Sequence, residues 1–158
     1  MVLHPKAQAV ALSLQYEVDM FISTAAQLNP ENDRPLFGGA RNAMLESFLI
    51  HARVLKGFFF DAPSYPDDVS AKHFFDNDQD WPLTCEGECP YLYANMSRIS
   101  KAVAHLSYER IGYEEDKNWD IRSILHELMT VWERFLSSLP HDRRRWFPDP
   151  KERASMVV

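Results

Sequence analysis

The sequence has little of what defines disulfide-rich, secreted or membrane-spanning proteins. Only two cysteines occur among 158 residues, so a disulfide framework cannot hold the fold. The longest purely apolar run, Phe58 to Phe60, is far shorter than the roughly 20 residues that a membrane-spanning helix needs. Residues 1–10 lack the apolar stretch and the cleavage site of a signal peptide. These absences predict a soluble, cytoplasmic protein without membrane association.

Motifs for nucleotide-dependent chemistry are also absent. Glycine accounts for only five residues, and no glycine-rich phosphate loop, dinucleotide-binding motif or nucleophile elbow occurs. ATP-dependent and dehydrogenase chemistry therefore have no support, and no cofactor is expected. The net charge of -6 disfavours a broad basic surface for nucleic acid, although it leaves room for a small basic site.

The chain is instead rich in helical periodicity. Hydrophobic residues make up 46% of the sequence and aromatic residues 13%, which is enough for one core. Apolar positions recur every three or four residues in four segments: 6–28, 40–60, 91–110 and 119–139. Asp116 or Asn118 is expected to cap the last of these. The pattern predicts an all-α protein, built as an antiparallel four-helix up-and-down bundle.

The acidic residues are concentrated in one part of the predicted domain. Residues 61–89 hold eight acidic side chains and one lysine, a net charge of -7, so the rest of the chain is nearly neutral. We interpret residues 1–140 as a single bundle domain with 61–89 as an acidic insertion, in which Asp68 caps a short extra helix at 69–75. The insertion is a candidate for gating the functional site. Residues 141–158 are predicted to be a basic, partly ordered tail.

Candidate functional residues lie in the third predicted helix. Arg98 and His105 are seven residues apart, about 20° short of two full turns, so they share one face. Asn95 and Glu109 extend this face at its ends. An imidazole can take a proton from a ribose 2′-hydroxyl, and a guanidinium can stabilise the phosphorane that forms. Arg98 and His105 are thus the predicted catalytic residues, with Asn95, Lys101 and Glu109 as substrate contacts. Alternatively, Arg98 pairs with an acidic residue and His105 is an ordinary, partly buried histidine.

The segment RISKAVAH, from Arg98 to His105, resembles the Arg-x(4-6)-His signature of the HEPN superfamily, small helical-bundle proteins of prokaryotic defence and toxin-antitoxin systems. The strings RNAMLESFLIHARVLKGFF and RISKAVAHLSYER are similar to uncharacterised bacterial proteins associated with this group. The resemblance implies a homodimer with metal-independent endoribonuclease activity, in which Arg98 and His105 are catalytic and an antitoxin-like protein is a partner. The residue after the arginine is typically polar in active members, whereas here it is Ile99. The alternative is a non-catalytic module that dimerises and binds a protein partner or a nucleotide.

A second group of polar residues lies in the segment 40–60. Glu46 and His51 are five residues apart, about 140° around a helix, so they cannot pair with each other. With Arg41, Asn42 and Arg53 they are expected to satisfy one another between helices, and Glu46 and His51 can each meet the third predicted helix.

Metal binding has weaker support. Cys85 and Cys89 have a spacing near that of zinc ligands, with His73 as a third, but a fourth ligand is missing. Residues 76–80 begin like a calcium loop, yet Trp81 occupies the position of the turn glycine. We expect two free thiols, a solvated acidic loop that Trp81 anchors to the bundle, and no metal site.

The basic cluster Arg143 to Arg145 lies next to Trp146 and Phe147. Such a cluster can hold a phosphate and stack a base. It can equally complement the carbonyl groups at the end of the last helix, and this second interpretation is the favoured one.

Overall fold

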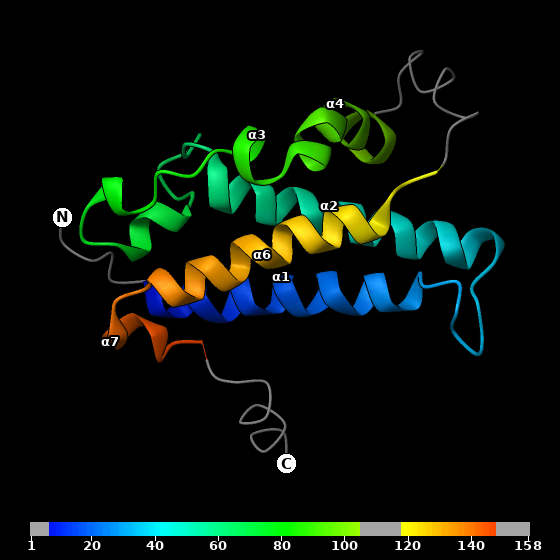
Figure 1. The fold of residues 1–158 in the computed structure, drawn as a ribbon, viewed down its shortest axis with the longest axis horizontal. Helices are drawn as coiled ribbons and strands as arrows, with labels where there is room; N and C mark the ends of the chain where they lie inside the picture. The colour runs from blue at the N-terminus through cyan, green and yellow to red at the C-terminus, as the bar shows by residue number, and fades with distance from the viewer. Residues whose placement is uncertain (1–6, 105–117, 148–158) are drawn as a thin grey trace.

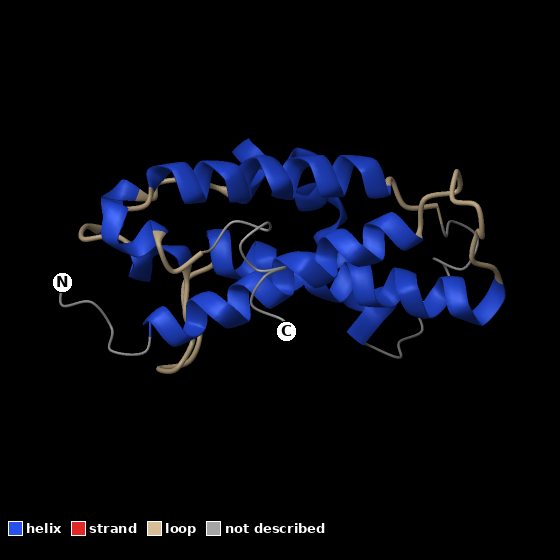
Figure 2. Ribbon diagram, turned by 90° about the horizontal axis from the view of Figure 1, so that it is seen from below, coloured by secondary structure: helices blue, strands red, loops and turns tan. Residues whose placement is uncertain are grey.

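The computed structural model describes residues 7–104 and 118–147, and every regular element within these ranges is helical. The four long helices are α1 (Ala7–Gln27), α2 (Gly38–Phe60), α4 (Pro90–Ala104) and α6 (Ile121–Ser138). The short elements are η1 (Ala71–Phe74), η2 (Asp78–Asp80), α3 (Cys85–Glu88) and α7 (His141–Arg144). Figure 1 shows the long helices side by side, and Figure 2 shows helices and loops, with no strand among the described residues. The all-α prediction is confirmed for this part of the chain. In the same part, no helix has both the length and the apolar character needed to cross a membrane.

The first two long helices form a hairpin, and their predicted bounds are close to the observed ones. Phe21 of α1 stacks on Phe48 of α2 with ring centroids 4.8 Å apart. α2 begins at Gly38, whose φ of 55° lies in the left-handed region that glycine adopts without steric cost. Ile22, an apolar residue of α1, is 40% exposed.

The hydrophobic core is centred on Phe135 of α6, whose side chain is fully buried. Its ring lies with its centroid 5.5 to 6.0 Å from those of seven aromatic rings: Phe58, Phe59, Phe74, Phe75, Trp81, Trp132 and Phe147. Most of these pairs meet edge to face, an arrangement that the ring quadrupoles favour. The seven rings come from α2, the insertion, α6 and the segment after α7, so one cluster joins distant parts of the chain.

Trp81 fixes the insertion to this core. Its side chain is buried, and its indole Nε1 donates a hydrogen bond of 2.7 Å to the carbonyl oxygen of Phe59 at the end of α2. The predicted anchoring by Trp81 is therefore confirmed. Figure 1 places η1 and η2 at the end of the molecule opposite the C-terminal end of α4, so this part of the insertion does not cover Arg98 as a gate would, whereas α3 adjoins α4.

The short helix of the insertion has a different cap from the one predicted. Asp68 accepts hydrogen bonds from the backbone amides of Ser64 and Tyr65, which closes a turn before the helix. Ser70 precedes η1, and its amide donates to Nδ1 of His73 in a reciprocal capping box. Asp68 is thus a turn residue, because the chain becomes helical two residues later than expected.

The cap of α6 also differs from the prediction. Asp120 is the N-cap, and its carboxylate accepts from the amide of Ser123 at 3.0 Å. Asn118 lies before the cap and instead offers its backbone carbonyl to Arg98. Asp116, the other predicted cap, lies outside the described residues.

The bundle's packing continues past residue 140, into the segment that the sequence analysis assigned to the tail. Arg143 of α7 is buried, donates to the carbonyl oxygen of Phe74 at 2.8 Å and pairs with Asp76. Phe147 is buried in the aromatic cluster. Arg143 therefore links α7 to the acidic insertion, and it is not a surface residue that can hold a phosphate.

The N-terminus of α4 is held by a carboxylate from another helix. Glu127 of α6 accepts hydrogen bonds from the amides of Tyr91 and Leu92, at 2.9 and 3.0 Å. These amides belong to the first turn of α4 and have no partner within the helix, and the negative charge also complements the helix dipole. Glu127 thereby sets the position of α4 against α6.

We predict that Phe135→Ala lowers the free energy of unfolding by about 3–5 kcal/mol, because it removes the ring at the centre of the core. Phe37→Ala is the matched control, since Phe37 is 77% exposed and should change stability little. Urea denaturation followed by circular dichroism measures both. Equal effects of the two substitutions would contradict this description of the core.

We also predict that Glu127→Ala costs about 1–3 kcal/mol of stability, because two amides of α4 lose their hydrogen-bond acceptor. Glu133→Ala removes an exposed carboxylate from the same helix and should have little effect. Hydrogen exchange at Tyr91 and Leu92 should accelerate only in Glu127→Ala, and unchanged exchange at these amides would show that the cap is dispensable.

Candidate functional site

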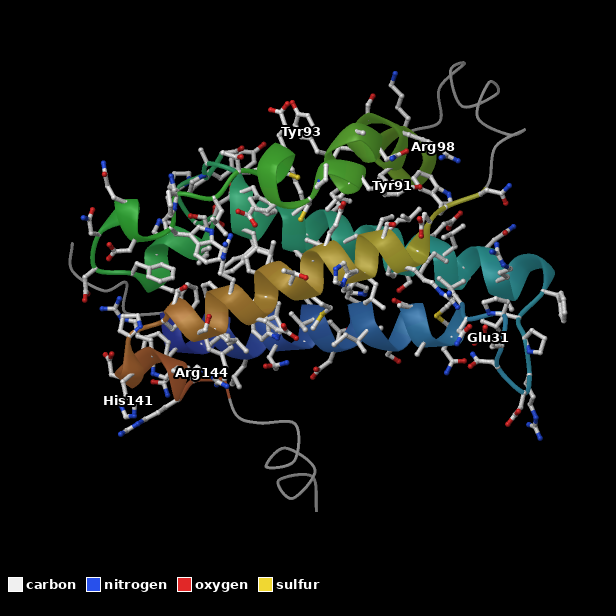
Figure 3. All side chains as sticks on the ribbon, viewed as in Figure 1. Glu31, Tyr91, Tyr93, Arg98, His141 and Arg144 are labelled. Atoms are coloured by element: carbon white, nitrogen blue, oxygen red, sulfur yellow. The ribbon has the colours of Figure 1, made fainter. Side chains whose placement is uncertain are left out.

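Arg98 lies where α4 meets the chain that leads into α6. Its guanidinium carbon is 3.9 Å from the centroid of the Trp119 ring, a close cation-π contact. Both Nη atoms donate to the backbone carbonyl oxygen of Asn118, each at 3.4 Å. The side chain is half-buried, and Figure 3 shows it near Tyr91 at this junction. The stacking and the hydrogen bonds together restrict the orientation of the guanidinium.

The helix face that carries Arg98 packs against the start of α6. Tyr91 lies seven residues before Arg98, and its hydroxyl accepts from the amide of Asp120 at 3.1 Å. Asn95, between them on this face, donates its Nδ2 to the carbonyl oxygen of Tyr91 at 2.8 Å. The predicted polar face therefore contributes to the contact between α4 and α6, and Asn95 is engaged within its own helix.

The remaining predicted site residues are only partly described. Lys101 is half-buried near the end of α4. His105 and Glu109 lie outside the described residues, so the structure does not place them relative to Arg98. Ile99 is fully buried. A polar residue directly after Arg98 would thus have to be accommodated in the core.

Asp120 is an acidic group at this junction whose pKa is shifted. The amide and the hydroxyl of Ser123 both donate to its carboxylate, and these hydrogen bonds lower the pKa of Asp120 below its usual value. The group is therefore an anion at neutral pH, which suits its place at the N-terminus of α6.

A groove that sequence reasoning missed lies beside Arg98. It has a volume of about 670 Å³ and runs between the end of α1, the loop to α2 and the start of α6. We call it the Trp119 groove, and its walls include Ile22, Pro30, Phe37, Arg41, Trp119 and Arg122. Sequence periodicity assigned Trp119 to the core of the fourth helix. No local pattern brings Phe37 and Trp119, 82 positions apart, to one groove.

His51 from the second polar group forms a hydrogen bond that crosses between helices. Its Nδ1 lies 2.6 Å from Oε2 of Glu17 on α1, and both side chains are partly buried. The partner of His51 is thus a residue of α1, not the third predicted helix or another member of its own group. Glu17 also lines a second hollow, of about 650 Å³, between α1, α2 and the chain that follows α2.

The two cysteines are buried and do not form a disulfide with each other. Burial raises the pKa of Cys85 from 9.0 to about 11, and that of Cys89 is also raised by burial. His73, the proposed third zinc ligand, is used in the cap of η1. Among the described residues, no cluster of three or more His, Cys, Asp or Glu side chains is placed to hold a metal ion.

Comparisons of the chain with protein-family models, curated proteins and solved structures each give no match. No residue role therefore comes to this chain from a relative.

We predict that stability falls as pH rises from about 9 toward 11. In this window the unfolded thiols lose protons that the folded ones keep, so the unfolded state binds fewer protons and the free energy of unfolding declines. Cys85→Ala should give a shallower decline than the unmodified protein. Urea denaturation at several pH values measures this difference, and identical slopes would show that Cys85 ionises normally in the folded protein.

Proposed function

We propose that the chain is a HEPN-like antiparallel four-helix bundle that acts as a metal-independent endoribonuclease through Arg98 and His105. The observation that carries this proposal is the restricted guanidinium of Arg98, stacked 3.9 Å from the Trp119 ring centroid. A guanidinium held in one orientation stabilises a phosphorane without first losing conformational freedom. The resemblance of the segment from Arg98 to His105 supplies the second residue.

In the proposed reaction, the imidazole of His105 takes the proton of a ribose 2′-hydroxyl, and the 2′-oxygen attacks the adjacent phosphorus. The bond from phosphorus to the 5′-oxygen then breaks, and that oxygen takes up a proton. The products are a 2′,3′-cyclic phosphate and a 5′-hydroxyl. Arg98 stabilises the negative charge on the phosphorane oxygens, while Asn95, Lys101 and Glu109 contact the substrate.

The proposal includes partners and location. By the resemblance, two copies of the chain would form a homodimer with their Arg98 and His105 residues facing each other. An antitoxin-like protein would restrain the activity in the cytoplasm.

A second candidate function is a non-catalytic module that dimerises and binds a protein partner or a nucleotide. The specific observation that favours it is that Arg98 makes structural contacts. Its Nη atoms donate to the carbonyl oxygen of Asn118, and its guanidinium stacks on the Trp119 ring. These contacts give Arg98 a structural role at the α4–α6 junction that does not require catalysis.

Cleavage of single-stranded RNA in the presence of EDTA tests the proposal. We expect the unmodified protein to cut RNA, and Arg98→Ala and His105→Ala each to lower the rate at least about a hundredfold. Arg53→Ala and His126→Ala replace exposed residues of the same types and should retain activity. Mass spectrometry of the products should show cyclic phosphate ends.

An inert protein under these conditions would contradict the ribonuclease proposal. If Arg98→Ala then alters the mass measured by light scattering, the binding module is the better description. Cleavage that survives both substitutions would indicate a contaminating nuclease or another site.

A further inference from the structure

The Trp119 groove and Arg98 share a side chain. The Trp119 ring stacks against the guanidinium of Arg98, and Trp119 also forms part of the groove wall. A ligand in the groove therefore lies next to the residue that is proposed to contact the scissile phosphate. We propose that the Trp119 groove is a nucleotide subsite for single-stranded RNA, which takes the base beside the cleaved bond. The choice of RNA rests on the proposed function.

The aromatic side chains of the groove fit a base. Phe37 is 77% exposed although it is a large apolar residue, and Ile22 on the groove wall is 40% exposed. Exposed aromatic rings with apolar neighbours form the stacking platforms of proteins that bind single-stranded nucleic acid. Trp119 is half-buried and contributes the second ring.

Two of the three charged residues that line the groove are cationic, whereas the chain as a whole is acidic. Arg41 and Arg122 line it, and Arg98 lies beside it. Two acidic groups also face this region. Asp120 lines the groove and keeps its negative charge while it caps α6 through Ser123, and Glu31 lies 3.6 Å from Arg122 in a pair that is highly exposed at both ends. Such an exposed pair is weak and can yield to a phosphate.

The size of the groove sets the substrate class. Its volume of about 670 Å³ is within the usual range of small-ligand sites and admits a base with its sugar. A base in a duplex is stacked and paired, so it cannot enter such a groove, whereas an unpaired base can. The groove thus predicts a preference for single strands over duplexes.

Binding of a fluorescent, 2′-O-methylated RNA oligonucleotide to the full chain tests this subsite, because that RNA cannot be cleaved through its 2′-oxygen. We expect Phe37→Ala to weaken binding about five- to a hundredfold, the range for loss of one stacking contact. Arg41→Ala should weaken binding and lower the slope of log K against log salt by about one.

The controls are Tyr65→Ala and Arg53→Ala. Tyr65 is 70% exposed outside the groove, and Arg53 is an exposed arginine of α2, twelve residues from Arg41. Both control variants should bind RNA as the unmodified protein does. A duplex of the same sequence should bind more weakly than the single strand.

The results separate this inference from the proposed activity. Unchanged RNA binding by Phe37→Ala and Arg41→Ala, or equal affinity for the duplex, would overturn the subsite even if the protein cleaves RNA. A protein that does not bind the oligonucleotide overturns it as well. Groove-dependent binding without cleavage of ordinary RNA would keep the subsite and reject the ribonuclease.

Discussion

The aromatic cluster around Phe135 is the constraint that the rest of the structure depends on. The acidic insertion and the basic C-terminal segment are rich in charged residues, which by themselves favour contact with solvent over packing against the long helices. Each contributes aromatic side chains, Trp81 and Phe147 among them, which become buried on the same ring. Burial of such rings provides a large part of the free energy that offsets ordering of the chain. Once they are buried, Arg143 can bridge the two segments through Phe74 and Asp76.

A different interaction positions α4, the helix on which the functional proposal depends. The carboxylate of Glu127 binds the first amides of α4, and the Tyr91 hydroxyl accepts from Asp120 near the start of α6. These polar contacts fix both the N-terminus of α4 and the rotation of its Arg98 face. The orientation of the guanidinium consequently depends on the placement of α4 against α6 and on Asn118 and Trp119, and not on Arg98 alone.

The surroundings of Arg98 explain how an acidic chain can be proposed to bind RNA. Most of the excess negative charge lies in residues 61–89, and η1 and η2 of that insertion lie at the end of the molecule away from the C-terminal end of α4. Near Arg98, the groove walls carry Arg41 and Arg122 together with Trp119. Because exposed charges separated by more than about 10 Å are largely screened at ordinary salt, the local balance matters more than the net charge of -6.

The sequence by itself determined the helices, because apolar residues at intervals of three and four specify which segments can bury one face as a helix. It also predicted that Trp81 anchors the insertion. Only the tertiary structure decided which polar residues meet: Glu17 with His51, Glu127 with the amides of α4, and Arg98 with Trp119. These partners are far apart in sequence, and their pairing depends on the relative placement of helices. Helical periodicity fixes the face on which a side chain lies, but the packing of the core fixes what that face meets.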